Sequence, residues 1–429
     1  MKLVIHPELS EWDELLSRPA FKFKKVEKIV KPILKKVKRQ GDKALRKFAF
    51  EYDHAEITDI AVSSEELKAC DRKISDELKE AIRVAKNNIE VFHRAQKDAV
   101  LEVKTMPGVK CSRKSVPISK VGLYIPGGTA PLFSTVLMLG VPAKIAGCQE
   151  IVLCTPPDRD GHIHPAILYT ARLIGIDKIF KVGGAQAIAA MAYGTESIPR
   201  VYKIFGPGNQ YVTVAKQEVQ RSGIAIDLPA GPSEVAVYAD KTSHPGFVAA
   251  DLLSQAEHGI DSQVLLVTTS EKVAEKVMEE VENQLELLPR KEITAQALEG
   301  SWAIVVKSNE EAIDLLNEYG AEHLILATED ARHLAKHIEN AGSVFIGPFT
   351  PESAGDYASG TNHTLPTNGY AKAYSGVSLD SFVKKITFQE ITPKGLQKLG
   401  PYIEVMAAAE ELDAHKEAVS IRLDYLKKK

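Results

Sequence analysis

Short apolar runs that lead into glycine turns and helical segments recur between Val116 and Gln220, and this pattern limits the possible folds most strongly. The runs VGLYI, EIVLC, KIFKV and VYKIF have the length of buried strands, and glycine turns follow three of them. Strands that alternate with helices in this way form βαβ crossovers and a parallel sheet. Such sheets bind ligands at the carboxyl ends of their strands, where these glycine turns lie.

A second series of strands follows nearer the carboxyl end of the chain. The segments SQVLLVTT, WAIVVK, EHLILAT and GSVFIG predict four strands with helices between them, and Phe382 to Ile391 predicts a further strand before a helix over Lys394 to Glu411. The first 105 residues are predicted to be helical, because Phe23 to Tyr52 and Ser75 to Val103 carry apolar residues at helical spacing, with Ser75 as an N-cap. The sequence therefore predicts an α/β protein.

Composition excludes several classes of function. The 429 residues are 44% hydrophobic with a net charge of -3, which is ordinary for a soluble globular protein and offers no basic surface for nucleic acid or anionic membranes. No apolar run approaches the ~20 residues of a membrane span, and acidic residues stand where a signal peptide needs its apolar core. We therefore expect a cytoplasmic protein.

The four cysteines lack CxxC spacing and are expected to be free thiols. Cys148 and Cys154 flank an apolar run and are expected in the core, and Cys70 has no partner at metal-ligand spacing. Cys111 lies in the polar run VKCSRKS and is the one candidate for an exposed nucleophile.

The segment from Gly347 to Tyr370 is a candidate functional loop. It holds four glycines and three prolines, with hardly an aliphatic side chain, so no core strand or amphipathic helix is expected there. Long loops without secondary structure are usually functional or disordered. Asp356, Tyr357 and His363 can coordinate, hydrogen-bond or stack, which favours function over disorder.

A polar stripe crosses the helix predicted for HPGFVAADLLSQAEHG. Asp251, Ser254, Gln255 and His258 are spaced i, i+3, i+4 and i+7, on a helix whose apolar residues occupy more than one face. A solvated face is one interpretation. The absence of Lys and Arg from the stripe favours burial, where polar groups need a partner or a metal, and Gln255 and His258 can hold one ion.

Two pairs near strand or helix ends are candidates for acid–base or metal chemistry. Glu322 and His323 can face one pocket if they lie just before their strand, as Gly320 allows, although such a pair also arises by chance. Asp413 is a candidate N-cap, which places His415 in a first helical turn, where the dipole keeps imidazole neutral and able to bind metal.

Tyr124, Gln186 and Asn209 each lie at or close to a glycine turn. Free N–H groups at the following helix suit a pyrophosphate, and these three side chains suit an adenine, a ribose or a nicotinamide. GPGNQY lacks the third glycine of the GxGxxG fingerprint, so plain βα turns are an equal alternative.

Eight motifs, in order along essentially the whole chain, resemble the histidinol dehydrogenase family. They are VGLYIPGGTAPLFSTVLM, VGGAQAIAAMAYGT, FGPGNQYV, LPAGPSEV, DLLSQAEHG, GAEHL, PESAGDYASGTNHTLPT and AAAEELDAHKEAV. The resemblance implies oxidation of L-histidinol through an aldehyde to L-histidine, the last two steps of histidine biosynthesis, with zinc in the site and two NAD+ reduced.

For the fold, the resemblance implies two incomplete, doubly wound Rossmann-like αβα domains with helical N-terminal and C-terminal extensions. The expected divisions are an N-terminal arm (1–22), a discontinuous first αβ domain with most of the site (23–122 plus 233–376), an NAD-contacting domain (123–232) and a C-terminal tail exchanged in a homodimer (377–429).

The resemblance also implies roles for individual residues. The zinc ligands would be Gln255, His258, Asp356 and His415, which would also contact the substrate. Glu322 would activate water and His323 would take the hydroxyl proton while contacting substrate. Further contacts would be Ser233, His363 and Glu410 to substrate, and Tyr124, Gln186 and Asn209 to NAD. Glu410 and His415 would reach into the partner subunit's site.

Three other functions remain open at this point. An aldehyde dehydrogenase would use Cys111, Cys148 or Cys154 as a thiolate nucleophile. A zinc-dependent hydrolase would use Glu322 to activate water, with purely structural glycine turns. A binding protein of the same fold would bind zinc and ligand without turnover.

Overall fold

The computed structural model describes every residue except 19–22, 128–129, 229–230 and 429, and the chain forms two compact units. The larger unit comprises Met1–Gln96 and Ile118–Phe382, and the C-terminal unit comprises Lys97–Pro117 and Val383–Lys429. Among the described residues, no helix has both the length and the apolarity needed to cross a membrane.

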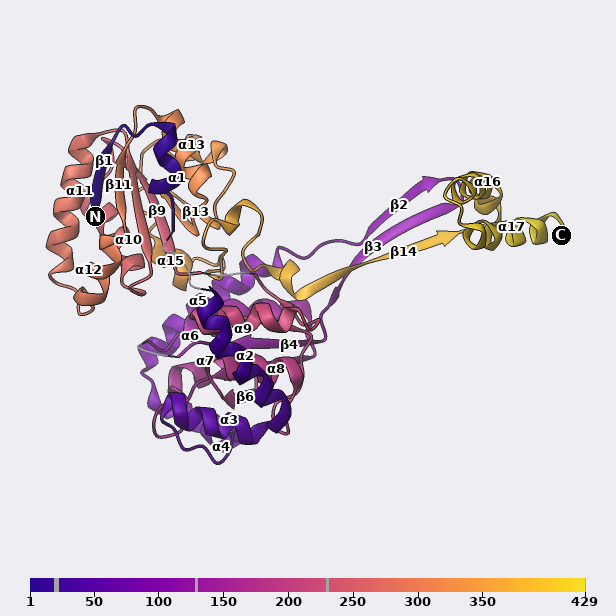
Figure 1. Cartoon of the computed structure of the whole chain (residues 1–429), viewed down its shortest axis with the longest axis horizontal. Helices are drawn as coiled ribbons and strands as arrows, with labels where there is room; N and C mark the ends of the chain where they lie inside the picture. Colours follow the sequence, from indigo (N-terminus) through magenta and orange to yellow (C-terminus); the bar gives the residue numbers. More distant parts are fainter. Residues whose placement is uncertain (19–22, 128–129, 229–230, 429) are drawn as a thin grey trace. The chain divides into compact units, whose positions relative to one another are not determined.

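The larger unit contains a six-stranded sheet whose strands are all parallel (Figure 1). Its strands are β1 (Lys2–Ile5), β9 (Glu234–Ala239), β10 (Gln263–Thr268), β11 (Trp302–Val305), β12 (His323–Leu326) and β13 (Ser343–Ile346). They lie in the order β1-β11-β10-β9-β12-β13. The four strands predicted from SQVLLVTT to GSVFIG are confirmed as β10 to β13.

Helices cover both faces of this sheet, which is why β9, β10 and β12 are buried throughout. One face packs against α10 (Pro245–Ala256), α11 (Glu271–Leu285) and α12 (Lys291–Glu299). The other packs against α1 (Trp12–Leu15), α13 (Asn309–Tyr319) and α14 (Ala331–Leu334). The short turns η1 (Leu9–Glu11) and η4 (Ala335–His337) adjoin α1 and α14.

A second parallel sheet of the larger unit confirms the strand–glycine–helix prediction. Its strands are β4 (Lys120–Tyr124), β5 (Glu150–Thr155), β6 (Lys178–Lys181), β7 (Lys203–Phe205) and β8 (Ala225–Ile226). Its helices are α6 (Phe133–Ala146), α7 (Pro165–Leu173), α8 (Gly184–Tyr193) and α9 (Gln210–Gln220). The order is β6-β5-β4-β7-β8. Numbered from its own first strand, this is 3-2-1-4-5, and β9 to β13 repeat it, so both sheets have Rossmann-like topology.

The N-terminal segments differ from the prediction in two respects. The first four residues after Met1 form an edge strand instead of an arm, since β1 pairs with β11 from Lys2↔Trp302 to Ile5↔Val305. The helices expected to join residues 233–376 pack on the second sheet instead, because their buried apolar stripes meet α6, α8 and α9. These helices are α2 (Phe23–Gln40), α3 (Asp42–Phe48) with η2 (Ala49–Asp53), α4 (Ser64–Ala69) with η3 (Cys70–Lys73), and α5 (Asp76–Arg94).

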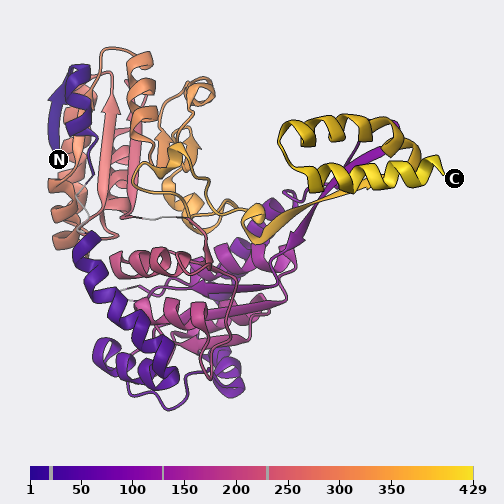
Figure 2. The same ribbon diagram turned by 45° about the vertical axis from the view of Figure 1, so that its right-hand side comes forward.

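The C-terminal unit is an antiparallel sheet joined to two helices that pack against each other (Figure 2). Its elements are β2 (Leu101–Met106), β3 (Val109–Pro117), β14 (Val383–Ile391), α16 (Pro393–Ala409) and α17 (Asp413–Lys427). The predicted strand and helix after Phe382 are confirmed. The helix predicted to continue to Val103 ends earlier, and β2 takes its last residues.

Two capping predictions have different outcomes. Ser75 is the N-cap of α5 and accepts a hydrogen bond from the Leu78 N–H at 3.2 Å. Asp413 is the first residue of α17, with Leu412 in the capping position, so the Asp413 cap was wrong. His415 nevertheless lies in the first turn of α17.

Candidate active site

Glu322 and His323 lie side by side where the chain enters β12. Gly320 ends α13 with a φ of 60°, a left-handed conformation that glycine adopts without strain, and turns the chain towards the strand. Glu322 directly precedes β12, so its side chain is free of the strict alternation of a strand, and its Oε2 lies 3.7 Å from Nδ1 of His323. Both side chains are buried.

The Glu322 carboxyl is held from two directions. Its Oε2 accepts hydrogen bonds from the Glu234 N–H at 3.0 Å and from Gln255 Nε2 at 3.3 Å. Burial raises the pKa of Glu322 to about 8 against the opposing charge of His323. Burial alone would lower the pKa of His323, but Glu322 and Asp356 outweigh it and raise that pKa to about 9.

The loop from Gly347 to Tyr370 contains a short helix, α15 (Glu352–Tyr357), so the prediction of no secondary structure was wrong there. Asp356 on this helix places Oδ1 3.4 Å from Nε2 of His323. The remainder of the segment includes η5 (Tyr370–Lys372), and η6 (Leu379–Phe382) follows it.

Glu352, one helical turn before Asp356, is a site residue that the sequence did not reveal. Its carboxyl is 2% exposed, with Oε1 3.9 Å from Nε2 of His323 and Oε2 accepting from Ser254 Oγ at 2.9 Å. The available signal was the i, i+4 spacing of the two acids in PESAGDY, which places both on one helical face. Treating the segment as irregular loop concealed that spacing.

Three buried oxygens around His323 accept no hydrogen bond from the described part of the chain: Gln255 Oε1, Glu352 Oε1 and Asp356 Oδ1. The ligand atoms of His323, Glu352 and Asp356 lie within 4.8 Å of one another. Buried acceptors without donors are costly, and such groups call for an explanation, an ion among them. Mixed oxygen and nitrogen donors of this kind fit zinc.

His258 follows Gln255 at the carboxyl end of α10. Its side chain reaches solvent, yet enough protein surrounds the ring for burial to lower its pKa, with Asp356 opposing the shift. The ring is therefore neutral at physiological pH and can bind a metal.

The other predicted substrate contacts of the larger unit also lie near these elements. His363 is hydrogen-bonded through both ring nitrogens, at 2.9 Å to the Asp356 carbonyl and 3.1 Å to Thr135 Oγ1. Burial lowers its pKa. Ser233 immediately precedes Glu234, whose N–H holds Glu322. Contact of Ser233 and His363 with substrate stays a prediction.

The three predicted NAD contacts lie at the carboxyl ends of β4, β6 and β7. The Tyr124 hydroxyl accepts a hydrogen bond from the Gly184 N–H at 3.0 Å, and Gln186 is buried in the first turn of α8. Asn209 is the N-cap of α9, with Oδ1 accepting from Tyr211 N at 3.0 Å and Val212 N at 3.2 Å. Capping accounts for this oxygen of Asn209, and its side-chain amide nitrogen is the group that can face a ligand.

Glu410 and His415 belong to the C-terminal unit. Glu410 lies at the end of α16 and His415 in the first turn of α17, and both are exposed within that unit. Their predicted roles stay predictions.

Comparison with known proteins identifies the family. The family model for histidinol dehydrogenase matches residues 16–423. A histidinol dehydrogenase of Bacteroides thetaiotaomicron is 62% identical over 427 residues, covering 100% of both chains. One of Escherichia coli is 53% identical over 96% of this chain and 95% of its own. The crystal structure of histidinol dehydrogenase from Elizabethkingia anophelis has a TM-score of 0.97 at 58% identity, covering 100% of this chain and 99% of its own.

The chain belongs to the histidinol dehydrogenase family. Membership makes it an oxidoreductase and confirms the resemblance inferred from the eight motifs.

In this member of the histidinol dehydrogenase family, the cysteines are poorly suited to act as thiolate nucleophiles. Cys70, Cys148 and Cys154 are buried. Burial raises the pKa of Cys148 to about 12 and that of Cys154 further still. Both thiols are therefore protonated and weak nucleophiles at neutral pH. Cys111, on β3 of the C-terminal unit, is half-buried.

We predict that iodoacetamide at mildly alkaline pH modifies at most one cysteine of the native protein, Cys111, without loss of dehydrogenase activity. The physical reason is that the other three thiols are both inaccessible and protonated. Intact-mass measurement followed by peptide mapping checks the site, with the Cys111→Ala variant as control. If Cys148 or Cys154 were modified at the same rate as activity is lost, the result would contradict this prediction and support a thiolate mechanism.

We predict that Glu352→Gln weakens zinc binding by about tenfold or more, because a buried carboxylate a few ångströms from a divalent ion contributes several kcal/mol even at high effective dielectric. Glutamine keeps the size of the side chain and an oxygen for Ser254. Competition with a chromogenic chelator measures the affinity. Glu257→Gln, which changes a partly exposed acid at the end of α10 directly before His258, is the matched control and should change the affinity little, because solvent screens its charge. Equal affinities in wild type and Glu352→Gln would remove Glu352 from the metal environment.

Proposed function

We propose that this chain is an NAD-dependent, zinc-containing histidinol dehydrogenase that oxidises L-histidinol through L-histidinaldehyde to L-histidine. The observation that carries the proposal is the buried Glu322–His323 pair beside three oxygens that accept no hydrogen bond from the described residues, in a chain that the family model matches over residues 16–423. A carboxyl–imidazole pair can act as acid and base, and the neighbouring oxygens can bind a metal. Together they suit the oxidation of an alcohol followed by the addition of water to the aldehyde.

The residues that would hold zinc are Gln255, His258 and Asp356, with His415 completing the set. Gln255 Oε1 and Asp356 Oδ1 accept no hydrogen bond from the described residues, which fits ligation, and His258 is neutral. Zinc, when bound, would orient the imidazole and amino nitrogens of the substrate. Glu352 adds negative charge around the ion.

His323, whose pKa of about 9 a bound cation would lower, would remove the hydroxyl proton in each oxidation. As hydride leaves the substrate carbon, the hydroxyl proton passes to a ring nitrogen of His323, and the ring becomes positively charged. Glu322, 3.7 Å from Nδ1, and Glu352, 3.9 Å from Nε2, stabilise that charge from opposite sides of the ring. The two contacts also fix the orientation of the ring.

Glu322 would activate the water that adds to the aldehyde. Its carboxylate takes one proton from water while the water oxygen bonds to the aldehyde carbon, and the proton that His323 took in the first oxidation passes to the aldehyde oxygen. The resulting hydrate is an alcohol again and His323 is neutral again, so the same removal of hydride and hydroxyl proton yields the carboxyl group of histidine. The Glu234 N–H and Gln255 Nε2 hold Glu322 in place for this step.

NAD+ accepts the hydride in both oxidations. The proposed contacts are Tyr124, Gln186 and Asn209, supported by their position at the carboxyl edge of the second sheet. In a sheet of this order, ligands bind where β4 and β7 lie side by side and the chain leaves them towards opposite faces.

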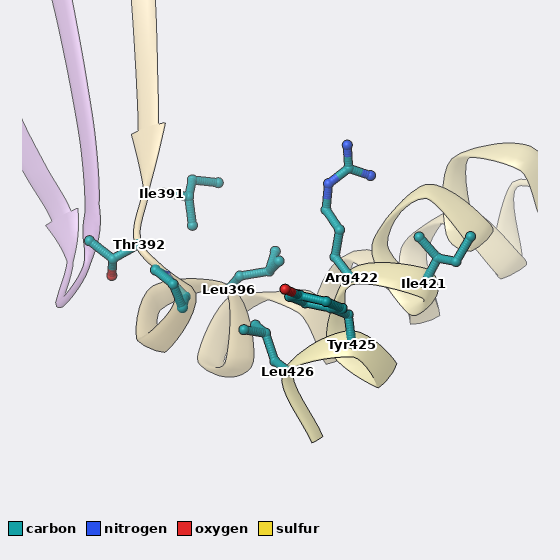
Figure 3. Close-up of a pocket in the computed structure, with 8 residues that line it drawn as sticks. Ile391, Thr392, Leu396, Ile421, Arg422, Tyr425 and Leu426 are labelled. Carbon is teal, nitrogen blue, oxygen red and sulfur yellow. The ribbon is translucent and has the colours of Figure 1, made fainter. Parts of the chain in front are cut away.

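We also propose a homodimer in which the C-terminal unit completes the partner's site with Glu410 and His415. Within this unit large apolar side chains are exposed, among them Tyr402, Val405, Met406 and Ile421. Ile421 also lines a cavity of about 560 Å³, and Figure 3 shows the mainly apolar lining of that cavity. Exposed apolar surface that gathers in one place marks protein interfaces. Free rather than paired cysteines in the described residues favour a cytoplasmic location.

The decisive test is NADH formation from histidinol and NAD+ by the zinc-loaded protein. We predict that Glu322→Gln slows oxidation of supplied histidinaldehyde about 100-fold or more, the usual contribution of a general base, and slows the first oxidation much less. Absorbance of NADH measures both, with the aldehyde trapped by semicarbazide to isolate the first step. Absence of NADH with wild type would refute the function. Equal losses in the two steps would refute only the role of Glu322.

Subunit complementation tests the shared site. We predict that Asp356→Asn and His415→Asn each lose zinc and activity, and that unfolding and refolding them together restores about a quarter of wild-type activity. Half of the mixed dimers are heterodimers, and each has one intact site of its two, because the intact Asp356 and His415 come from different subunits. Metal analysis and turnover on the mixed sample measure the recovery. No recovery in a sample shown to contain heterodimers would mean that both residues serve the same subunit.

A further inference from the structure

A buried ion pair anchors the turn that follows β7 in the second sheet. Lys216 on α9 and Asp227 just after β8 contact each other through Nζ and Oδ1. Lys216 is 3% exposed, and the side chain of Asp227 is 1% exposed. Neither belongs to the residues proposed above to bind zinc, substrate or NAD.

Both members of the pair bind one peptide position, Gly206. Lys216 Nζ donates to the Gly206 carbonyl at 2.9 Å, and the Gly206 N–H donates to Asp227 Oδ2 at 2.7 Å. Asp227 Oδ1 also accepts from the Leu228 N–H at 2.8 Å. The pair therefore holds both hydrogen-bonding groups of a single glycine.

The same glycine fits closely against the neighbouring strand. Gly206 has a φ of 133°, and a Cβ there would lie 2.1 Å from the carbonyl oxygen of Tyr124. Tyr124 in turn binds the Gly184 N–H through its hydroxyl. The hydrogen bonds from Lys216 and Asp227 to Gly206 thus hold the Gly206–Asn209 turn close to β4. This is the point where the sheet order reverses and where ligands bind in such sheets.

Stability alone is a poor reason for such a pair. Removing two charges from water costs about as much as their attraction returns, so an apolar pair of the same volume is often equally stable. What the pair supplies is a fixed backbone conformation, because Gly206 cannot rotate about its φ and ψ while its N–H and its carbonyl are both hydrogen-bonded. A turn fixed before ligand arrives avoids the ordering cost on binding.

We propose that Lys216 and Asp227 are positioning residues that preorganise the Gly206–Asn209 turn for the pyrophosphate and nicotinamide parts of NAD. The proposal rests on the proposed function as an NAD-dependent dehydrogenase. The ion pair does not touch the dinucleotide. It acts through the backbone of the turn and through the placement of Asn209 at the start of α9.

The test is the double variant Lys216→Met/Asp227→Leu, which removes both charges and leaves neither buried alone. We expect NAD+ affinity, measured by calorimetry without substrate, to fall roughly fivefold or more. Hydrogen exchange at the Gly206 amide should speed up in the ligand-free protein. KM for NAD+ should rise in parallel, while KM for histidinol, zinc content and kcat at saturating NAD+ stay within about twofold.

The matched control is Lys181→Met/Glu66→Leu, another ion pair with a buried lysine on the same sheet, which links α4 to β6. It should leave NAD+ affinity unchanged. If the apolar double variant does not fold, Lys216→Gln/Asp227→Asn keeps polar atoms near Gly206 and should show a smaller loss of NAD+ affinity of the same kind.

A folded variant with wild-type NAD+ affinity and wild-type exchange at Gly206 would overturn the proposal. So would an equal loss of NAD+ and histidinol binding, which indicates general unfolding. Failure of the proposed function is separate, because it appears as absence of histidinol turnover in the wild-type protein.

Discussion

Three carboxyl groups around one imidazole, two of them buried and one partly buried, set the main physical constraint on this molecule. Glu322, Glu352 and Asp356 all lie near His323, and burial raises the pKa of the two glutamates to about 8. Asp356 is the exception, since His323 and Glu352 outweigh its burial and hold its pKa well below the usual range. Full ionisation would leave an excess of negative charge in a dry site, and a divalent cation is the simplest group that removes it. The surrounding helices and strands bring these acids together from separate parts of the chain.

The two sheets share one strand order but present their proposed functional residues at opposite edges. In the second sheet, the proposed NAD contacts lie at the carboxyl ends of the strands, as the general rule for open α/β sheets requires. In the larger sheet, Glu322 and Ser233 precede β12 and β9, at the amino ends, and α10 returns Gln255 to them from the opposite edge. The same topology therefore serves as the scaffold in both sheets. The chemistry of each sheet depends on which of its loops carry the polar residues.

The sequence predicted the fold class and several of the residues that the structure brings together around His323, because those features have local signals. Glycine turns after apolar runs located β4, β6 and β7, and Gly320 correctly indicated that Glu322 and His323 can meet. Glu352 was missed because α15 has too few apolar residues to show a helical period. The packing of α2 and α5 on the second sheet was missed for a different reason. An amphipathic stripe shows that a helix buries one face, but not which sheet it covers. The family resemblance, rather than any local signal, supplied the roles of Glu410 and His415.

Two groups of buried polar side chains in the larger unit differ in how fully they are hydrogen-bonded. Lys216 and Asp227 pair with each other and bind the N–H and the carbonyl of Gly206. Their charges are therefore neutralised within the protein, and their role is to fix the backbone. Gln255, Glu352 and Asp356 each keep one buried oxygen without a hydrogen bond among the described residues. A folded chain tolerates unsatisfied buried oxygens at a cost, and that cost is recovered when a ligand binds them. Between these two groups, the fully hydrogen-bonded ion pair therefore fixes the backbone, and the oxygens without a donor around His323 are the ones placed to bind an ion.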